Sequence, residues 1–204
     1  MSPRKRELNE QMRANALEKI TKAAMTVFSE NGYHGTTIKQ ISAATGLSYG
    51  LVYHYFSSKE ELFRHLVDVA LDTSISTIEP ALDAPGTAWE KLENLSNVIA
   101  REAFTGEASL YFIIMLQAMT QGRKIPGLID HIRARSAKHY ERIVPVLREA
   151  QESGEAAKGD PMVLAATYFA CAQGLSLLVF QEKEMEGRIT PDTLTSVLRN
   201  RGDQ

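Results

Sequence analysis

Hydrophobic and polar residues alternate with the period of an α-helix along most of the chain. In the segment 9–30, apolar residues recur on one helical face at Leu17, Ile20, Ala24 and Phe28. Similar patterns predict further helices at 38–44, 48–55, 59–78, 87–104, 107–120, 127–153 and 161–180, and from 191 onward. No segment shows the strict alternation of a half-buried strand. The sequence therefore predicts an all-α fold of about nine helices.

Short polar residues stand where the second and third helices begin. Thr37, with Gln40 three residues later, predicts a capping box. Ser48 predicts the N-cap of the third helix, and residues 45–47 predict the turn before it. Two short helices joined by a three-residue turn that contains glycine form a helix-turn-helix. We therefore predict such a unit at 37–56.

The same turn also matches an enzyme motif. Gly46-Leu47-Ser48-Tyr49-Gly50 is a Gly-x-Ser-x-Gly sequence, which is typical of the nucleophile elbow of serine hydrolases. That elbow needs a strand before the serine and a sheet around it. Here a capped helix precedes Gly46, and the chain offers no strands. We predict that the protein is not an enzyme. A serine hydrolase with Ser48 as its nucleophile is a remote alternative.

Charge is distributed unevenly along the 204 residues. Residues 1–60 hold 8 Lys and Arg against 5 Asp and Glu, whereas residues 61–204 hold 15 against 20. The N-terminal part, which opens with a basic arm at 1–9 (Arg4, Lys5, Arg6), therefore suits an anionic partner, and the rest does not.

An uncharged segment at 161–180 is about as long as a bilayer span. Thr167, Tyr168, Gln173 and Ser176 are scattered through it, and the residues that follow it are mostly acidic. We predict a buried core or dimer-interface helix and no membrane span, with a membrane-anchored DNA binder as a remote alternative.

Cysteine and acidic residues suggest neither a disulfide nor a metal. The single cysteine, Cys171, excludes an intrachain disulfide, which fits a cytoplasmic protein. Asp68 and Asp72 lie one turn apart near His65, but they do not form a metal-ligand set of the right type and spacing. We therefore expect no metal and no cofactor.

The run from Ile20 to Phe63 resembles the DNA-binding domain of TetR/AcrR-family transcriptional regulators. The chain differs from the family at Ser42 and Thr45, where the family commonly has alanine. It depends on a set of shared features: Ala23-Ala24, Phe28, Gly32-Tyr33, Thr36-Thr37, Ile41, Gly46-Leu47-Ser48, Gly50, Tyr53, Phe56 and Ser58-Lys59-Glu60.

The resemblance implies roles for residues in this domain, which we expect to cover 1–58. Thr37, Tyr55 and Lys59 correspond to phosphate contacts, which anchor the protein with little sequence information. Ser48 begins the helix that enters the major groove. That helix contains no Arg, Lys, Asn or Gln, so we expect Tyr hydroxyls, apolar contacts and DNA shape to carry the specificity. The groove-facing positions are Lys39, Tyr49, Gly50, Leu51 and Tyr53.

The resemblance also implies that residues 59–204 bind a small-molecule effector and form a homodimer. A flat helical face predicts the dimer interface, at Ala166, Ala170, Gly174 and Leu177. Aromatic and methionine residues are candidates for a pocket for a neutral or lipophilic effector: Trp89, Phe104, Tyr111, Phe112, Met115, Met119, Tyr140 and Phe169. We expect a repressor of an inverted-repeat operator that the effector releases; an activator would use the same residues.

Overall fold

The computed structural model describes residues 3–103, 108–185 and 187–200. Apart from an isolated antiparallel bridge between Ala156 and Arg199, the regular structure of this part is helical, which confirms the predicted all-α class. Its α-helices are α1 (Pro3–Gly35), α2 (Ile38–Thr45), α3 (Tyr49–Tyr55), α4 (Lys59–Asp83), α5 (Ala88–Ala103), α6 (Ala108–Gln121), α7 (Leu128–Glu152), α8 (Pro161–Gln181) and α9 (Pro191–Thr195). Short 3₁₀ turns lie at Gly122–Lys124 and Lys183–Met185.

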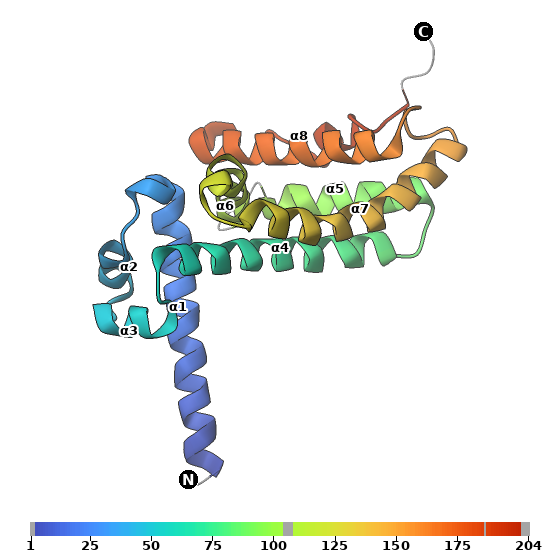
Figure 1. Ribbon diagram of the computed structural model, residues 1–204. Coiled ribbons are helices and arrows are strands. Elements are labelled where there is room, and N and C mark those ends of the chain that lie inside the picture. The colour runs from blue at the N-terminus through green and yellow to red at the C-terminus, as the bar shows by residue number, and fades with distance from the viewer. Residues whose placement is uncertain (1–2, 104–107, 186, 201–204) are drawn as a thin grey trace.

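The helices form two groups that α4 connects (Figure 1). Helices α1, α2 and α3 gather at the N-terminal end of α4, and the N-terminal half of α1 projects away from the other helices. The rest of α4 runs beneath α5 and α7, and α8 lies on the far side of these two helices. Helix α4 thus belongs to both groups.

The first hydrophobic core does not stop at the end of α3. The ring of Phe28 lies 5.2 Å from that of Phe63, between centroids, and both side chains are fully buried. Ile114 of α6 belongs to the same core, and Gln117 Nε2 donates to the carbonyl oxygen of Phe28 at 2.8 Å. The N-terminal group therefore packs directly on α6 as well as on α4.

The second core fills the space between α4, α5, α7, α8 and α9. Tyr168 is fully buried there, and its hydroxyl lies 2.9 Å from Ser96 Oγ. This hydrogen bond satisfies both hydroxyls, as buried polar groups require, and burial raises the pKa of Tyr168.

Helix α4 is longer than the sequence predicted. The pattern favoured an end at Ile78 and a loop through Pro80, but the helix continues to Asp83. Ala81 and Leu82 are buried on the same face as Ile78, and this packing favours the helical path although Pro80 cannot donate a hydrogen bond.

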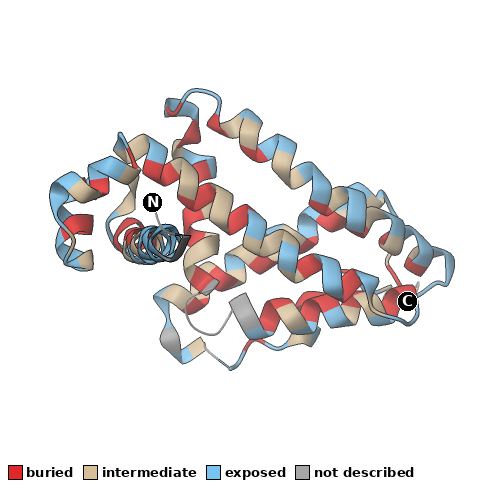
Figure 2. Ribbon diagram, turned by 90° about the horizontal axis from the view of Figure 1, so that it is seen from below, coloured by how far each residue is buried: buried red, intermediate tan, exposed pale blue. Residues whose placement is uncertain are grey.

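The expected basic arm is also helical, since α1 begins at Pro3. Residues 5–15 are all exposed (Figure 2), and Arg6 pairs with Glu10 one turn later at 3.4 Å. This segment is rich in good helix formers, which allows the helix to extend beyond the packed part of α1. The backbone leaves the helical conformation at Gly32, where the sequence predicted an end.

Candidate DNA-binding surface and effector cavity

Hydroxyl side chains hold the turn between α2 and α3. Ser42 Oγ donates to the carbonyl oxygen of Leu47 at 2.7 Å, and Thr45 Oγ1 accepts from the Leu47 amide at 3.1 Å. Gly46 has a φ of 68° in the left-handed region, where glycine is favoured. Ser42 and Thr45, which replace the alanines common in the family, therefore fix this turn by hydrogen bonds that alanine could not form.

The predicted caps are present at both helices of the unit. The Gln40 amide donates to Thr37 Oγ1 at 3.3 Å, and Gln40 Oε1 accepts from the Thr37 amide at 2.7 Å. Ser48 Oγ accepts from the Leu51 amide at 3.2 Å. Ser48 thus follows a helix and caps the next one, which is not the strand-to-helix setting of a hydrolase nucleophile.

Two tyrosines form the exposed face of α3. Tyr49 and Tyr53 are 52% and 40% exposed, whereas Val52 on the other face is fully buried. The two rings lie 4.8 Å apart, and the Tyr49 hydroxyl donates to that of Tyr53 at 3.3 Å. This hydrogen bond raises the pKa of Tyr49. The face therefore presents two linked hydroxyls and two ring edges to an approaching molecule.

The other candidate groove and phosphate residues of the unit are also accessible. Thr37, Lys39 and Ser48 are exposed, and Leu51 is half-buried. A Cβ atom built on Gly50 would meet no other atom within 4 Å, so the backbone at this position faces open space.

Tyr55 and Lys59 make internal contacts that the sequence did not predict. The Tyr55 hydroxyl donates to the carbonyl oxygen of Arg13 at 3.3 Å. Lys59 Nζ donates to the carbonyl oxygens of Tyr33 at 2.7 Å and Thr36 at 3.0 Å, and it lies 4.7 Å from the centroid of the Tyr33 ring. Burial lowers the pKa of Lys59. Both side chains thus tie α1 to the elements that follow it.

A cavity of about 140 Å³ lies between α4, α5, α6, α7 and α8. We call it the inner cavity. Five of the eight residues that the sequence suggested for an effector pocket line it: Tyr111, Phe112, Met115, Tyr140 and Phe169.

The other three suggested pocket residues lie elsewhere. Met119 lines an outer hollow of about 790 Å³ next to the inner cavity. Trp89 lies outside the walls of both, because its indole Nε1 donates to Glu93 at 2.7 Å and its ring packs in the second core. Phe104 falls outside the described residues.

The sequence missed the polar part of the inner cavity. Its wall includes Ser74 and Thr77 of α4, His139 of α7 and Gln173 of α8. The only signal for it in the sequence is a set of small polar residues in the otherwise apolar face of α4, and these residues by themselves indicate no more than a helix.

Helix α8 buries one side and exposes the other. Ala165, Tyr168 and Ala172 are buried against the bundle. The opposite side is exposed although it is mostly apolar, and it includes Met162, Val163, Ala166, Ala170 and Gly174, with Leu177 half-buried at its edge. By length and composition α8 could cross a membrane, with 28% of its most apolar window buried in the described structure.

Comparison with known proteins identifies the N-terminal unit. Residues 20–66, which include the capped turn, the tyrosine face and the start of α4, match the family model of bacterial regulatory proteins of the tetR family. This N-terminal unit is a DNA-binding domain of the TetR family. The chain is a DNA-binding transcriptional regulator and not an enzyme.

Relatives and solved structures extend the similarity beyond this TetR-family domain to most of the chain. The fatty acid metabolism regulator protein of Bacillus subtilis is 29% identical over 149 residues, covering 72% of this chain and 73% of the relative. The HTH-type regulator UidR of Escherichia coli is 25% identical over 137 residues, covering 67% of each chain. The fold is shared with the MbdR regulator of Azoarcus sp. CIB, with a TM-score of 0.74 and 24% identity over 90% of this chain and 94% of that one. It is also shared with AibR in complex with isovaleryl coenzyme A and operator DNA, with a TM-score of 0.68 and 19% identity over 87% and 92%.

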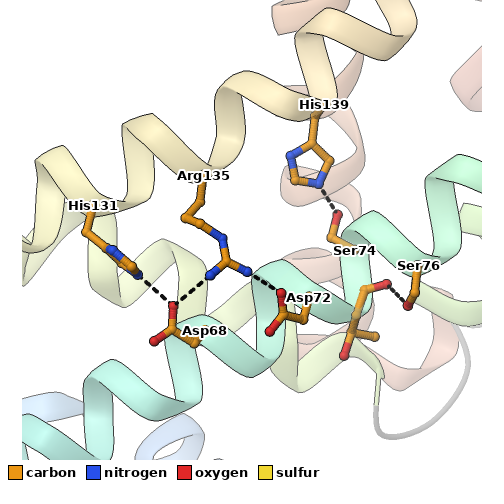
Figure 3. Close-up of polar contacts among 8 residues, drawn as sticks. Asp68, Asp72, Ser74, Ser76, His131, Arg135 and His139 are labelled. Carbon is orange, nitrogen blue, oxygen red and sulfur yellow. Dashed lines mark hydrogen bonds and ion pairs between the residues drawn. The ribbon is translucent and has the colours of Figure 1, made fainter.

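Behind the TetR-family domain, charged side chains join α4 to α7 beside the inner cavity (Figure 3). His131 Nε2 lies 2.6 Å from Asp68 Oδ1, and Arg135 pairs with both Asp68 and Asp72. We call these four residues the α4–α7 seam. Within residues 3–103, 108–185 and 187–200, no group of three or more His, Cys, Asp or Glu side chains is arranged to hold a metal ion.

Proposed function

We propose that this regulator is a cytoplasmic, ligand-responsive repressor that binds an inverted-repeat operator as a homodimer and releases it when a small molecule occupies the inner cavity. The observation that carries this proposal is the position of α4. Its first turn is hydrogen-bonded to the N-terminal unit through Lys59, and residues 70–78 form a wall of the cavity. A ligand that changes how α4 packs would therefore move the DNA-binding unit.

In the proposed complex, α3 enters the major groove with Tyr49, Gly50 and Tyr53 toward the bases. The absence of bidentate readers from α3 leaves hydroxyl contacts, thymine methyl contacts and DNA shape as the sources of specificity. Lys39, Thr37 and Ser48 are exposed beside α3, where they can reach the DNA backbone or the groove edge.

The exposed side of α8 supports the proposed homodimer. Ala166, Ala170 and Gly174 have small side chains that permit close helix packing, and an exposed apolar face of this length is unusual in a monomer. A two-fold dimer would present two copies of α3 to major grooves about 34–36 Å apart.

The experiment that tests the proposal is selection of bound duplexes from a random DNA pool at about physiological salt. Enrichment of an inverted repeat is the expected result, and the absence of any enriched sequence with folded protein would refute it. Placing the selected operator upstream of or across a promoter in a reporter strain then separates repression from activation.

The dimer is tested with a matched pair of variants. Ala170→Arg puts a long cation on the exposed side of α8 and should yield a monomer by sedimentation equilibrium, with loss of operator binding. Ala134→Arg makes the same change at an exposed position of α7 and should remain dimeric. An Ala170→Arg variant that stays dimeric would contradict the assigned interface.

A further inference from the structure

The walls of the inner cavity are mostly apolar and aromatic. Leu71, Ile78, Ile99, Phe112 and Phe169 contribute large apolar surfaces from four helices. The charged side chains of the neighbouring seam pair with one another, and among the described residues of the wall none is Asp, Glu, Lys or Arg. An occupant of this cavity would therefore find no counter-ion in these walls.

The inner cavity itself has room for about one ring. Its volume is about 140 Å³. An apolar protein cavity of about 150 Å³ holds one benzene molecule. The outer hollow shares Met115, Ser136, Tyr140 and Gln173 with the inner cavity, so it offers a route of entry.

The hydrogen-bonded pair of Ser74 and His139 forms a polar part of the cavity wall. His139 Nε2 lies 3.0 Å from Ser74 Oγ (Figure 3), and the imidazole is also hydrogen-bonded to the backbone of Ser136. His139 is buried, its ring packs edge-on against that of Phe169 at 6.0 Å, and burial lowers its pKa. The imidazole is therefore neutral at pH 7.

The hydrogen-bond directions of this pair follow from the neutral imidazole. When one ring nitrogen donates to the Ser136 backbone, Nε2 accepts the proton of the Ser74 hydroxyl. The oxygen of Ser74 then has lone pairs left to accept a hydrogen bond from an occupant.

We propose that the inner cavity binds an uncharged molecule of about one ring that carries a hydroxyl or amide N–H donor, which Ser74 accepts. The inference rests on the proposed function, since it names the class of effector for that regulator. A carboxylate of the same size is excluded, because the free energy lost by burying an ion without a partner exceeds the free energy gained by burying its ring. A ring without a donor binds more weakly, because Ser74 then gains no partner.

The test uses three probes on the full chain at pH 7.5: benzyl alcohol, toluene and benzoate, with dissociation constants from ligand-observed NMR titration. Benzyl alcohol should bind at least about 10-fold more tightly than benzoate, because the anion loses its hydration without compensation. Equal or tighter binding of benzoate would overturn the proposal.

A pair of serine variants on α4 tests the role of Ser74. Ser74→Ala should weaken benzyl alcohol about 5-fold, the worth of one ordinary hydrogen bond, and leave toluene unchanged. Ser76→Ala is the control, because the Ser76 hydroxyl is exposed and donates to the backbone of Thr73. Equal weakening of toluene and benzyl alcohol in Ser74→Ala would mean that the change is structural and would overturn the assignment.

A measurement on the unmodified protein does not depend on how the variants fold. Nuclear Overhauser contacts between benzyl alcohol and the rings of Phe112 and Phe169 are expected, and contacts only with residues of the outer hollow such as Met119 would overturn the site. Operator binding is measured separately. Selective operator binding without binding of any probe refutes this inference alone, whereas binding of benzyl alcohol by a chain that selects no DNA refutes the proposed function alone.

Discussion

Replacing Lys59 with methionine should destabilise the protein even in the absence of DNA. The Lys59 ammonium donates to two backbone carbonyls at the end of α1 and lies over the ring of Tyr33. Methionine keeps much of the apolar stem but removes the charge and both donors. The carbonyls of Tyr33 and Thr36 then lose these partners at the point where α1, α2 and α4 meet.

The magnitude follows from these contacts. Hydrogen bonds to charged groups contribute about 1.5–3 kcal/mol each, and a cation over an aromatic ring adds about 0.5–1 kcal/mol at an accessible site. Water at the half-buried carbonyls and the recovered desolvation of the ammonium offset a large part of this gain. We therefore expect a loss of about 2 kcal/mol, which for a chain of this size lowers Tm by about 4–8 °C.

The assay is thermal and urea unfolding followed by circular dichroism, with Lys39→Met as the matched control. Lys39 is exposed on α2, so its removal should weaken DNA binding but leave Tm within about 1 °C. An unchanged Tm in Lys59→Met, or an equal loss in both variants, would refute the structural role that we assign to Lys59.

Three further predictions concern the turn, the buried histidines and the seam. Gly46→Ala should cost about 1 kcal/mol by urea unfolding, because the residue has a φ of 68° where a side chain is strained; an unchanged midpoint would contradict this conformation. His139 and His65 both have a pKa lowered by burial, so the unfolded chain binds more protons than the folded one below about pH 6.5, and stability should fall as pH drops through this range. His139→Gln should make that fall shallower in unfolding measured from pH 8 to pH 5, and an unaltered slope would argue against a neutral buried imidazole. Arg135→Gln should lower stability by about 1 kcal/mol at low salt and by much less in 1 M NaCl, because its pairs with Asp68 and Asp72 are partly exposed; a loss independent of salt would point to packing instead.

The sequence predicted the start of a helix correctly where the side chains at that point alone determine it. The Thr37 and Ser48 caps lie at the predicted positions, because a hydroxyl that satisfies a first-turn amide is a local property. The predicted end of α4 was wrong, because packing against distant helices determines where this helix ends. A proline favours a helix end locally, but the burial of Ala81 and Leu82 depends on α5 and α7, which a single segment does not reveal.

The candidate sites also combine features that the local sequence predicts with features that depend on residues far apart in the sequence. The exposure of Tyr49 and Tyr53 follows from the helical period once Val52 is placed in the core. The inner cavity could be predicted only in part, because aromatic and methionine residues mark both cavity walls and ordinary core. The hydrogen bond between Ser74 and His139 joins residues 65 positions apart. The internal contacts of Lys59 are made to two backbone carbonyl oxygens, which no pattern of side chains indicates.

The free energy available from the inner cavity matches what the proposed switch requires. Moving a two-state equilibrium from 1:99 to 99:1 needs about 5.5 kcal/mol of differential binding, or about 2.7 kcal/mol from each ligand of the proposed dimer. One hydrogen bond to Ser74 contributes about 1 kcal/mol, which is too little by itself. Filling a cavity of 140 Å³ recovers about 3 kcal/mol at about 24 cal/mol per Å³. The ligand can therefore drive release only if the DNA-bound state closes most of this volume, and α4, which forms a wall of the cavity and is tied to the DNA-binding unit by Lys59, is the helix whose shift would close it.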